Sequence, residues 1–138
     1  MTLIILHQSR KTGIQINPGA TLGSGLYIPH YGGIVVNPQT VIGNNCYLSH
    51  NVLIGKVHAG KREGVPAIGN DVFIGTGAVL LGHIKVGNNA ALGVNSVVID
   101  DVPAGVMVAG APAKVIAQRG AREILGLLDE IESDGGSL

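Results

Sequence analysis

Aliphatic side chains recur at every sixth position along most of the chain. One unbroken series of these anchors runs from Ile68 to Val98, and an earlier one runs from Val36 to Ile54. Four residues after each anchor stands a small or β-branched side chain, such as Ala78. Neither the 3.6-residue period of a helix nor the two-residue period of a strand produces this spacing. A period of six predicts a parallel β-helix, in which three hexads close one triangular coil.

Two interruptions break the six-residue period. The phase slips by two residues between Pro29 and Val35. In residues 58–66 a second interruption separates Ile54 from Ile68 by fourteen residues, which we interpret as two hexads plus two extra residues that protrude as a loop. Loops that leave a rigid scaffold often carry function, so both interruptions are candidate sites.

The pattern divides the chain into three predicted parts. Residues 1–13 form a short helix or strand that leads in, residues 14–116 form an all-β β-helix of roughly five coils, and residues 117–138 form a short C-terminal α-helix and tail. The helical spacing rests on four apolar residues, Ile124, Leu127, Leu128 and Ile131. We expect this helix to pack over the end of the prism or on a neighbouring copy, because an open β-helix end exposes unpaired strand edges.

Composition and charge narrow the classes of function. Nine basic and nine acidic residues give a net charge of zero, which excludes a broad electrostatic surface for nucleic acid or anionic membranes. The single cysteine, Cys46, falls on an inward position, so we expect a buried, unreactive thiol. The apolar run Leu3 to Leu6 is too short for a signal sequence or a membrane span, and we therefore expect a cytoplasmic protein without membrane insertion.

Residues 13 to 116 resemble the catalytic domain of hexapeptide-repeat acyltransferases of the serine acetyltransferase type. The resemblance rests on the hexads, on the motif HYGGIVVNP that begins at His30, and on the closing GAPAKVI element. The HxGGIVVNP form is shared with the shorter relatives associated with polysaccharide biosynthesis, which look nearest. The resemblance implies a left-handed β-helix, a homotrimer, and acetyl-CoA as co-substrate in a groove between adjacent prisms.

In this family a histidine near the groove removes the proton of an acceptor hydroxyl, which then attacks the thioester directly, and His30 matches that base. An imidazole is suited to this task because it exchanges protons near neutral pH. Gln15 stands where the family places an acidic partner for the histidine. Its amide can orient the ring but cannot stabilise imidazolium by charge.

His50 lies twenty residues after His30. Once the two-residue slip is removed, it occupies the equivalent place one coil further along. We therefore expect the two imidazoles to line the same side of the groove, where His50 shapes the acceptor pocket or bonds a substrate oxygen. A histidine on the surface without a role is the alternative.

For the acetyl-CoA donor, the family uses backbone amides and small side chains that let the pantetheine arm lie flat. The matching positions here are Gly55, Gly75, Gly77, Ala78 and Gly93. Lys114 matches a basic residue near the nucleotide phosphates, where an ammonium acts as a point charge. Glycines required only by tight corners are the alternative interpretation of the first set.

Departures from the family pattern favour a sugar or glycan hydroxyl as acceptor. Pro29 replaces the acidic residue before the histidine, and Gly64 and Val65 replace an Arg-His pair; in the serine enzymes those groups recognise the amino acid. Serine O-acetyl transfer is the alternative, and a non-catalytic trimeric scaffold is the alternative of another class. A zinc carbonic anhydrase on the same prism needs three histidine ligands, and no third histidine follows His30 and His50 at short spacing, so no metal is predicted.

Overall fold

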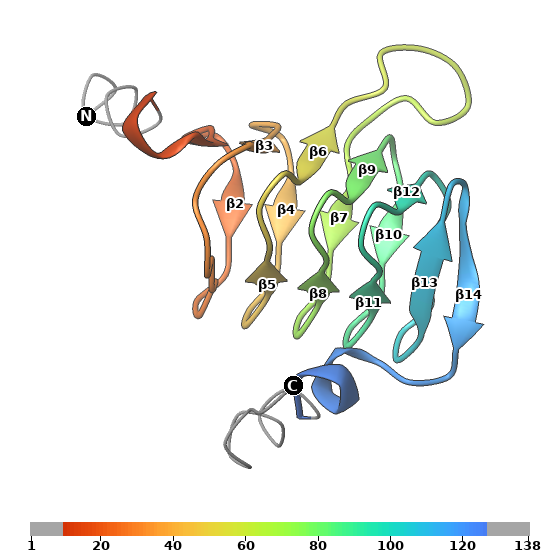
Figure 1. The fold of residues 1–138 in the computed structure, drawn as a ribbon. Helices are drawn as coiled ribbons and strands as arrows, with labels where there is room; N and C mark the ends of the chain where they lie inside the picture. The colour runs from red at the N-terminus through yellow and green to blue at the C-terminus, as the bar shows by residue number, and fades with distance from the viewer. Residues whose placement is uncertain (1–9, 127–138) are drawn as a thin grey trace.

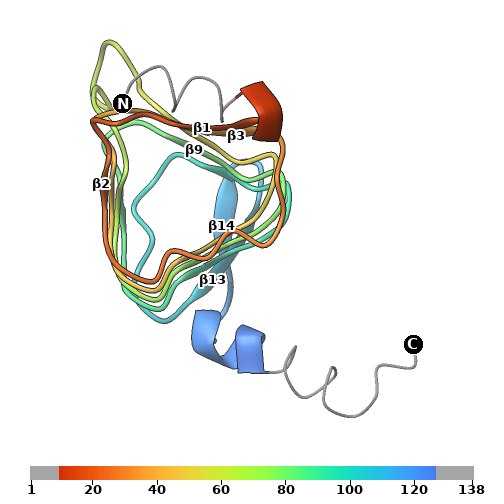
Figure 2. The same cartoon turned by 90° about the vertical axis from the view of Figure 1, so that its left-hand side faces the viewer.

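The computed structural model describes residues 10–126, and short strands wind through it around a triangular prism (Figures 1 and 2). The strands are β1 (Ile14–Ile16), β2 (Thr21–Leu22), β3 (Ile34–Val36), β4 (Val41–Ile42), β5 (Tyr47–Leu48), β6 (Leu53–Gly55), β7 (Ala67–Ile68), β8 (Phe73–Ile74), β9 (Val79–Leu81), β10 (Lys85–Val86), β11 (Ala91–Leu92), β12 (Val97–Val98), β13 (Met107–Gly110) and β14 (Ala113–Ala117). Short helical segments occur at residues 10–12 and 121–126. None of the helices in this part of the chain is long and apolar enough to cross a membrane.

Three sheets form the three faces of the prism. The first face has the strand order β1-β3-β6-β9-β12, the second β2-β4-β7-β10, and the third β5-β8-β11-β13-β14. All strand pairs are parallel except β13 with β14. The five strands of the first face correspond to five coils. The predicted left-handed parallel β-helix is confirmed.

The register of the paired strands shows how many residues each interruption adds to the repeat. In a regular coil the paired residues are eighteen apart, as for Ala67 and Lys85. Across the phase slip, Ile14 pairs with Ile34, twenty positions later. This is two residues more than in a regular coil, as the sequence predicted. Across the loop, Val41 pairs with Ala67, twenty-six positions later.

The loop is therefore an insertion of eight residues, and the interpretation of two hexads plus two residues was wrong. Ile54 in β6 and Ile68 in β7 are consecutive anchors on adjacent faces. The interval of fourteen residues fits one hexad plus eight as well as it fits two hexads plus two. Only the pairing of the strands distinguishes these two arrangements.

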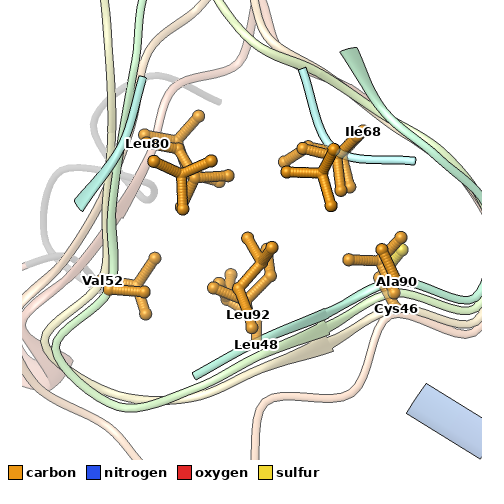
Figure 3. Packing of buried hydrophobic residues seen from close by; sticks show 14 of the residues in the cluster. Cys46, Leu48, Val52, Ile68, Leu80, Ala90 and Leu92 are labelled. Atoms are coloured by element: carbon orange, nitrogen blue, oxygen red, sulfur yellow. The ribbon is translucent and has the colours of Figure 1, made fainter. Parts of the chain in front are cut away.

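The anchors and the small or β-branched residues four positions after them both point inward, and together they fill the interior of the prism (Figure 3). Anchors such as Leu48, Leu80 and Leu92 are at most 1% exposed. Each fully buried side chain of this size contributes about 1.5–3 kcal/mol. Cys46 lies among them, as predicted, with its Sγ 3.2 Å from the carbonyl oxygen of Gly69. Burial raises the pKa of the Cys46 thiol.

The C-terminal region differs from the prediction. Ala117 ends strand β14, which folds back antiparallel on β13 and crosses the end of the prism (Figure 2). The helical segment begins only at Ala121 and packs against a corner of the prism near Asn89, rather than over its end. Leu127, Leu128 and Ile131, on which the helix was also predicted, and the lead-in residues 1–9 lie outside the described residues.

Candidate functional site

The corner between the third and first faces carries the two histidines singled out by the sequence. His30 follows Tyr27 by three residues, and His50 follows Tyr47 by three. Tyr27 and Tyr47 form a parallel bridge, so the two histidines occupy equivalent places in adjacent coils. The same place in the next two coils is held by Thr76 and Val94.

The imidazole rings of His30 and His50 are in contact. Their centroids are 5.4 Å apart and their planes meet at 89°, an edge-to-face arrangement. The expected juxtaposition is therefore present. His30 is exposed, whereas His50 is partly buried, and its Nδ1 is enclosed without a hydrogen-bond partner. Within residues 10–126, no group of three or more His, Cys, Asp or Glu side chains is placed to hold a metal ion.

Gln15 lies on β1, where it pairs with Val35 of β3, and its side chain is exposed. In the part of the chain that the structure describes, no hydrogen bond joins the Gln15 amide to His30 or His50. The role of Gln15 in orienting the base thus remains a prediction.

The glycine positions predicted to hold the donor are required by the stacking of the coils. A Cβ atom on Gly75 would lie 2.7 Å from the carbonyl oxygen of Leu92. One on Gly77, where φ is +75°, would lie 2.1 Å from the side-chain oxygen of Asn95. One on Gly55 would lie 2.8 Å from a methyl group of Leu81. The backbone contact at Gly75 and the positive φ at Gly77 disfavour side chains, so the structure explains these two glycines without a ligand, whereas the Leu81 side chain beside Gly55 can move.

The backbone amides at four of the predicted donor-binding positions are already engaged within the prism. The amide of Gly75 donates to the carbonyl of Leu92, and that of Gly77 to the carbonyl of His50. The amide of Ala78 donates to the carbonyl of Gly75, and that of Gly93 to the carbonyl of Val108. The side chain of Ala78 is also buried in the core. These positions therefore offer a smooth surface but no free amide, and their contact with a donor stays a prediction.

Lys114 is exposed on β14, opposite Ala109 of β13. Strand β14 lies at the C-terminal end of the prism, whereas β3, which follows His30, lies near the other end (Figure 1). The structure thus does not bring Lys114 together with the two imidazoles in one chain.

The connection between β6 and β7, residues 56–66, contains the eight-residue insertion and protrudes from the corner between the first and second faces (Figure 1). Val57 and Gly64 exchange two backbone hydrogen bonds of 3.0 Å across its base. Arg62 of this loop forms an ion pair with Asp100. Sequence reasoning missed Asp100, because nothing in the repeat pattern shows that the loop folds back over this corner.

A hollow of about 560 Å³ lies beside this loop. It is lined by Lys61, Arg62, His83, Asp100 and Asp101. A side chain at Gly64 would be strained, because φ there is +132° and a Cβ atom would lie 3.0 Å from that of His83.

The chain is similar to serine acetyltransferases over most of its length. It is 39% identical over 122 residues to the enzyme of Synechococcus elongatus, covering 86% of this chain and 49% of that protein. It is 42% identical over 107 residues to the enzyme of Helicobacter pylori, covering 78% and 63% respectively. The chain thus spans about half to somewhat under two thirds of these relatives. No protein-family model matches it.

Solved structures of serine acetyltransferases are also similar to this chain. The crystal structure of serine acetyltransferase from Brucella abortus superimposes with a TM-score of 0.78 at 39% identity, covering 84% of this chain and 47% of that one. The same enzyme in complex with coenzyme A superimposes with a TM-score of 0.79 at 37% identity, covering 84% and 46%. These relatives are named for serine, so they give no support to the expected nearness to polysaccharide-biosynthesis enzymes.

Proposed function

We propose that this chain catalyses transfer of an acetyl group from acetyl-CoA to a hydroxyl group of a small molecule. The observation that carries the proposal is the pair of touching imidazoles at one corner of a β-helix that is about 40% identical to serine acetyltransferases. The relative solved with coenzyme A supports acetyl-CoA as the donor. The exposed ring of His30 is the accessible base of the pair.

The reaction proceeds by direct attack in a ternary complex. His30 accepts the proton of the acceptor hydroxyl as the oxygen forms a bond to the thioester carbonyl carbon. The tetrahedral intermediate then collapses, the carbon–sulfur bond breaks, and the sulfur of coenzyme A takes the proton from the imidazolium of His30. The products are the acetyl ester and coenzyme A, and no enzyme-bound acetyl group is formed.

Serine is the first candidate acceptor, because the similar proteins are serine acetyltransferases. A sugar hydroxyl is the second candidate. The observation that favours it is Gly64, at which the resemblance places an arginine of the serine enzymes. With φ at +132° and a Cβ atom 3.0 Å from that of His83, such a side chain would be strained here.

We also propose that the protein acts as a homotrimer. Val35 and Leu53 on the first face are 37% and 38% exposed, which is consistent with a face covered by a second copy. Light scattering on the purified protein measures the mass of the assembly. A mass equal to that of one chain would contradict this part of the proposal.

Purified protein incubated with acetyl-CoA and a panel of acceptors tests the proposed function. We expect release of coenzyme A that depends on the acceptor, with L-serine tested beside a set of monosaccharides and sugar nucleotides. Calorimetry with coenzyme A alone measures donor binding independently. Absence of both binding and transfer would overturn the proposal and favour a non-catalytic scaffold.

A further inference from the structure

We propose that His50 is a second catalytic residue, whose Nε2–H donates a hydrogen bond to the thioester oxygen as that oxygen gains negative charge. The inference rests on the proposed acetyl transfer and assigns a role that His30, as the base, does not fill. It begins from the two nitrogens of the His50 ring, whose surroundings differ.

The surroundings of the two nitrogens determine which of them carries the proton. Nδ1 of His50 is enclosed and has no hydrogen-bond partner. Nε2 is not enclosed in this way, and it makes no hydrogen bond to any residue between 10 and 126. In a neutral imidazole one nitrogen donates and the other accepts. Buried N–H groups without an acceptor are rarer in proteins than buried acceptors without a donor. The proton of the neutral ring therefore belongs on Nε2, which leaves a donor at the accessible edge.

Three of the backbone amides near this corner are committed to other acceptors, so a side-chain donor adds to what the backbone can offer there. The amides of Gly77 and Asn51, which adjoin the histidine corner, donate to the carbonyls of His50 and Gly32. The amide of Ser49 donates to Ile74. A tetrahedral intermediate is stabilised most by donors that already point at the developing charge. The His50 side chain can supply such a donor without breaking the hydrogen bonds between coils.

The His50 ring lies close enough to His30 for the two imidazoles to have different roles in one reaction. With ring centroids 5.4 Å apart, the two imidazoles are close enough to contact two oxygens bound to one carbon through hydrogen bonds of about 2.7–3.1 Å. His30 takes the proton from the attacking oxygen. His50 keeps its proton and shares it with the carbonyl oxygen until the carbon–sulfur bond breaks and the carbonyl re-forms.

Replacements at His50 test the role by separating loss of a donor from loss of the ring. His50→Ala removes the donor, and we expect kcat for transfer from acetyl-CoA to fall by about 10²–10³-fold with little change in KM. His50→Gln keeps an N–H donor, and we expect it to stay within about tenfold of the unmodified enzyme. His83→Gln makes the same chemical change at an exposed histidine of another corner and serves as the control. Equal losses in His50→Gln and His50→Ala, or no loss in His50→Ala, would overturn the inference.

A second measurement does not depend on activity. Nitrogen-15 spectra of the histidine side chains in the unmodified protein report which ring nitrogen carries the proton, and His50→Gln identifies the His50 signals. We expect a proton on Nε2, and a proton on Nδ1 would overturn the inference. Failure of the proposed function itself would look different, because the unmodified protein would then neither bind coenzyme A nor transfer acetyl groups, and the role of His50 would fall with it.

Discussion

The side-chain carbonyl of Asn89 accepts a hydrogen bond of 2.9 Å from the backbone amide of Arg122, thirty-three residues later. The main-chain carbonyl of Asn89 accepts another, of 3.0 Å, from Ala121. The guanidinium of Arg122 also contacts the carboxylate of Asp71 at 2.8 Å. The first amides of a helix have no partner within the helix itself, so a corner of the prism caps the C-terminal helix.

Gly120→Ala should destabilise this junction. A Cβ atom at position 120 would lie 2.0 Å from the carbonyl oxygen of Asn89, and this backbone contact has little freedom to yield. We expect a loss of about 1–3 kcal/mol in the free energy of unfolding, measured by chemical denaturation. Gly126→Ala is the matched control, because nothing lies within 4 Å of a Cβ at that position. Equal stability of the two variants would show that the contact is not maintained in solution.

His30→Ala should lower turnover by about two to four orders of magnitude, the range for loss of a general base. Because His30 is exposed, the thermal unfolding temperature and the affinity for coenzyme A should change little. Steady-state kinetics with the best acceptor of the panel measures the effect. An unchanged kcat would remove His30 from the reaction.

Gln15→Glu should raise kcat by roughly tenfold. The resemblance places an acidic partner of the base at this position, where a carboxylate would stabilise the imidazolium that forms on His30, and about 1.4 kcal/mol of such stabilisation corresponds to a factor of ten. Gln39→Glu introduces the same charge at another exposed position and controls for net charge. Should both variants leave kcat unchanged, charge beside the base does not limit the reaction.

Thr40→Val should stabilise the protein by about 1 kcal/mol. The Thr40 side chain is 0% exposed, and its hydroxyl has no hydrogen-bond partner among the described residues. Valine has nearly the same shape and removes the cost of an unsatisfied buried hydroxyl. The denaturant midpoint measures the change, and Thr21→Val, at an exposed site on β2, is the control. A destabilised Thr40→Val variant would indicate that the hydroxyl is satisfied in solution.

Cys46 should react slowly with iodoacetamide in the folded protein, at least about 100-fold more slowly than after unfolding, since labelling requires local opening. Burial, aided by the charge of Asp71, raises the pKa of the Cys46 thiol above its ordinary value of 9.0. The folded state then holds this proton more tightly than the unfolded chain. The resulting contribution to stability is present below about pH 9 and is lost as the pH rises through the raised pKa. Rapid labelling at neutral pH would contradict this account.

The faces and interior of the prism could be predicted because one side-chain property repeats at one spacing. Leu48 and Leu92 are both anchors of the hexad, and anchor positions point into the prism, so their burial could be predicted. The juxtaposition of His30 and His50 could also be predicted, since the slip between them was visible as two extra residues. Neither prediction needed information about distant contacts.

Features that depend on contacts between distant segments could not be predicted in this way. The size of the inserted loop required the pairing of Val41 with Ala67. Strand β14 exists because β13 offers it an antiparallel edge, although its sequence shows no alternation that demands a strand. The ion pair of Arg62 with Asp100 joins residues thirty-eight positions apart and leaves no periodic signal.

The side chains at one corner of the prism vary from coil to coil, from His30 and His50 to Thr76 and Val94. Imidazole, hydroxyl and isopropyl groups succeed one another there, while the aliphatic columns beneath them continue unchanged. Side chains at this edge can therefore differ from coil to coil without disturbing the buried columns that hold the prism together.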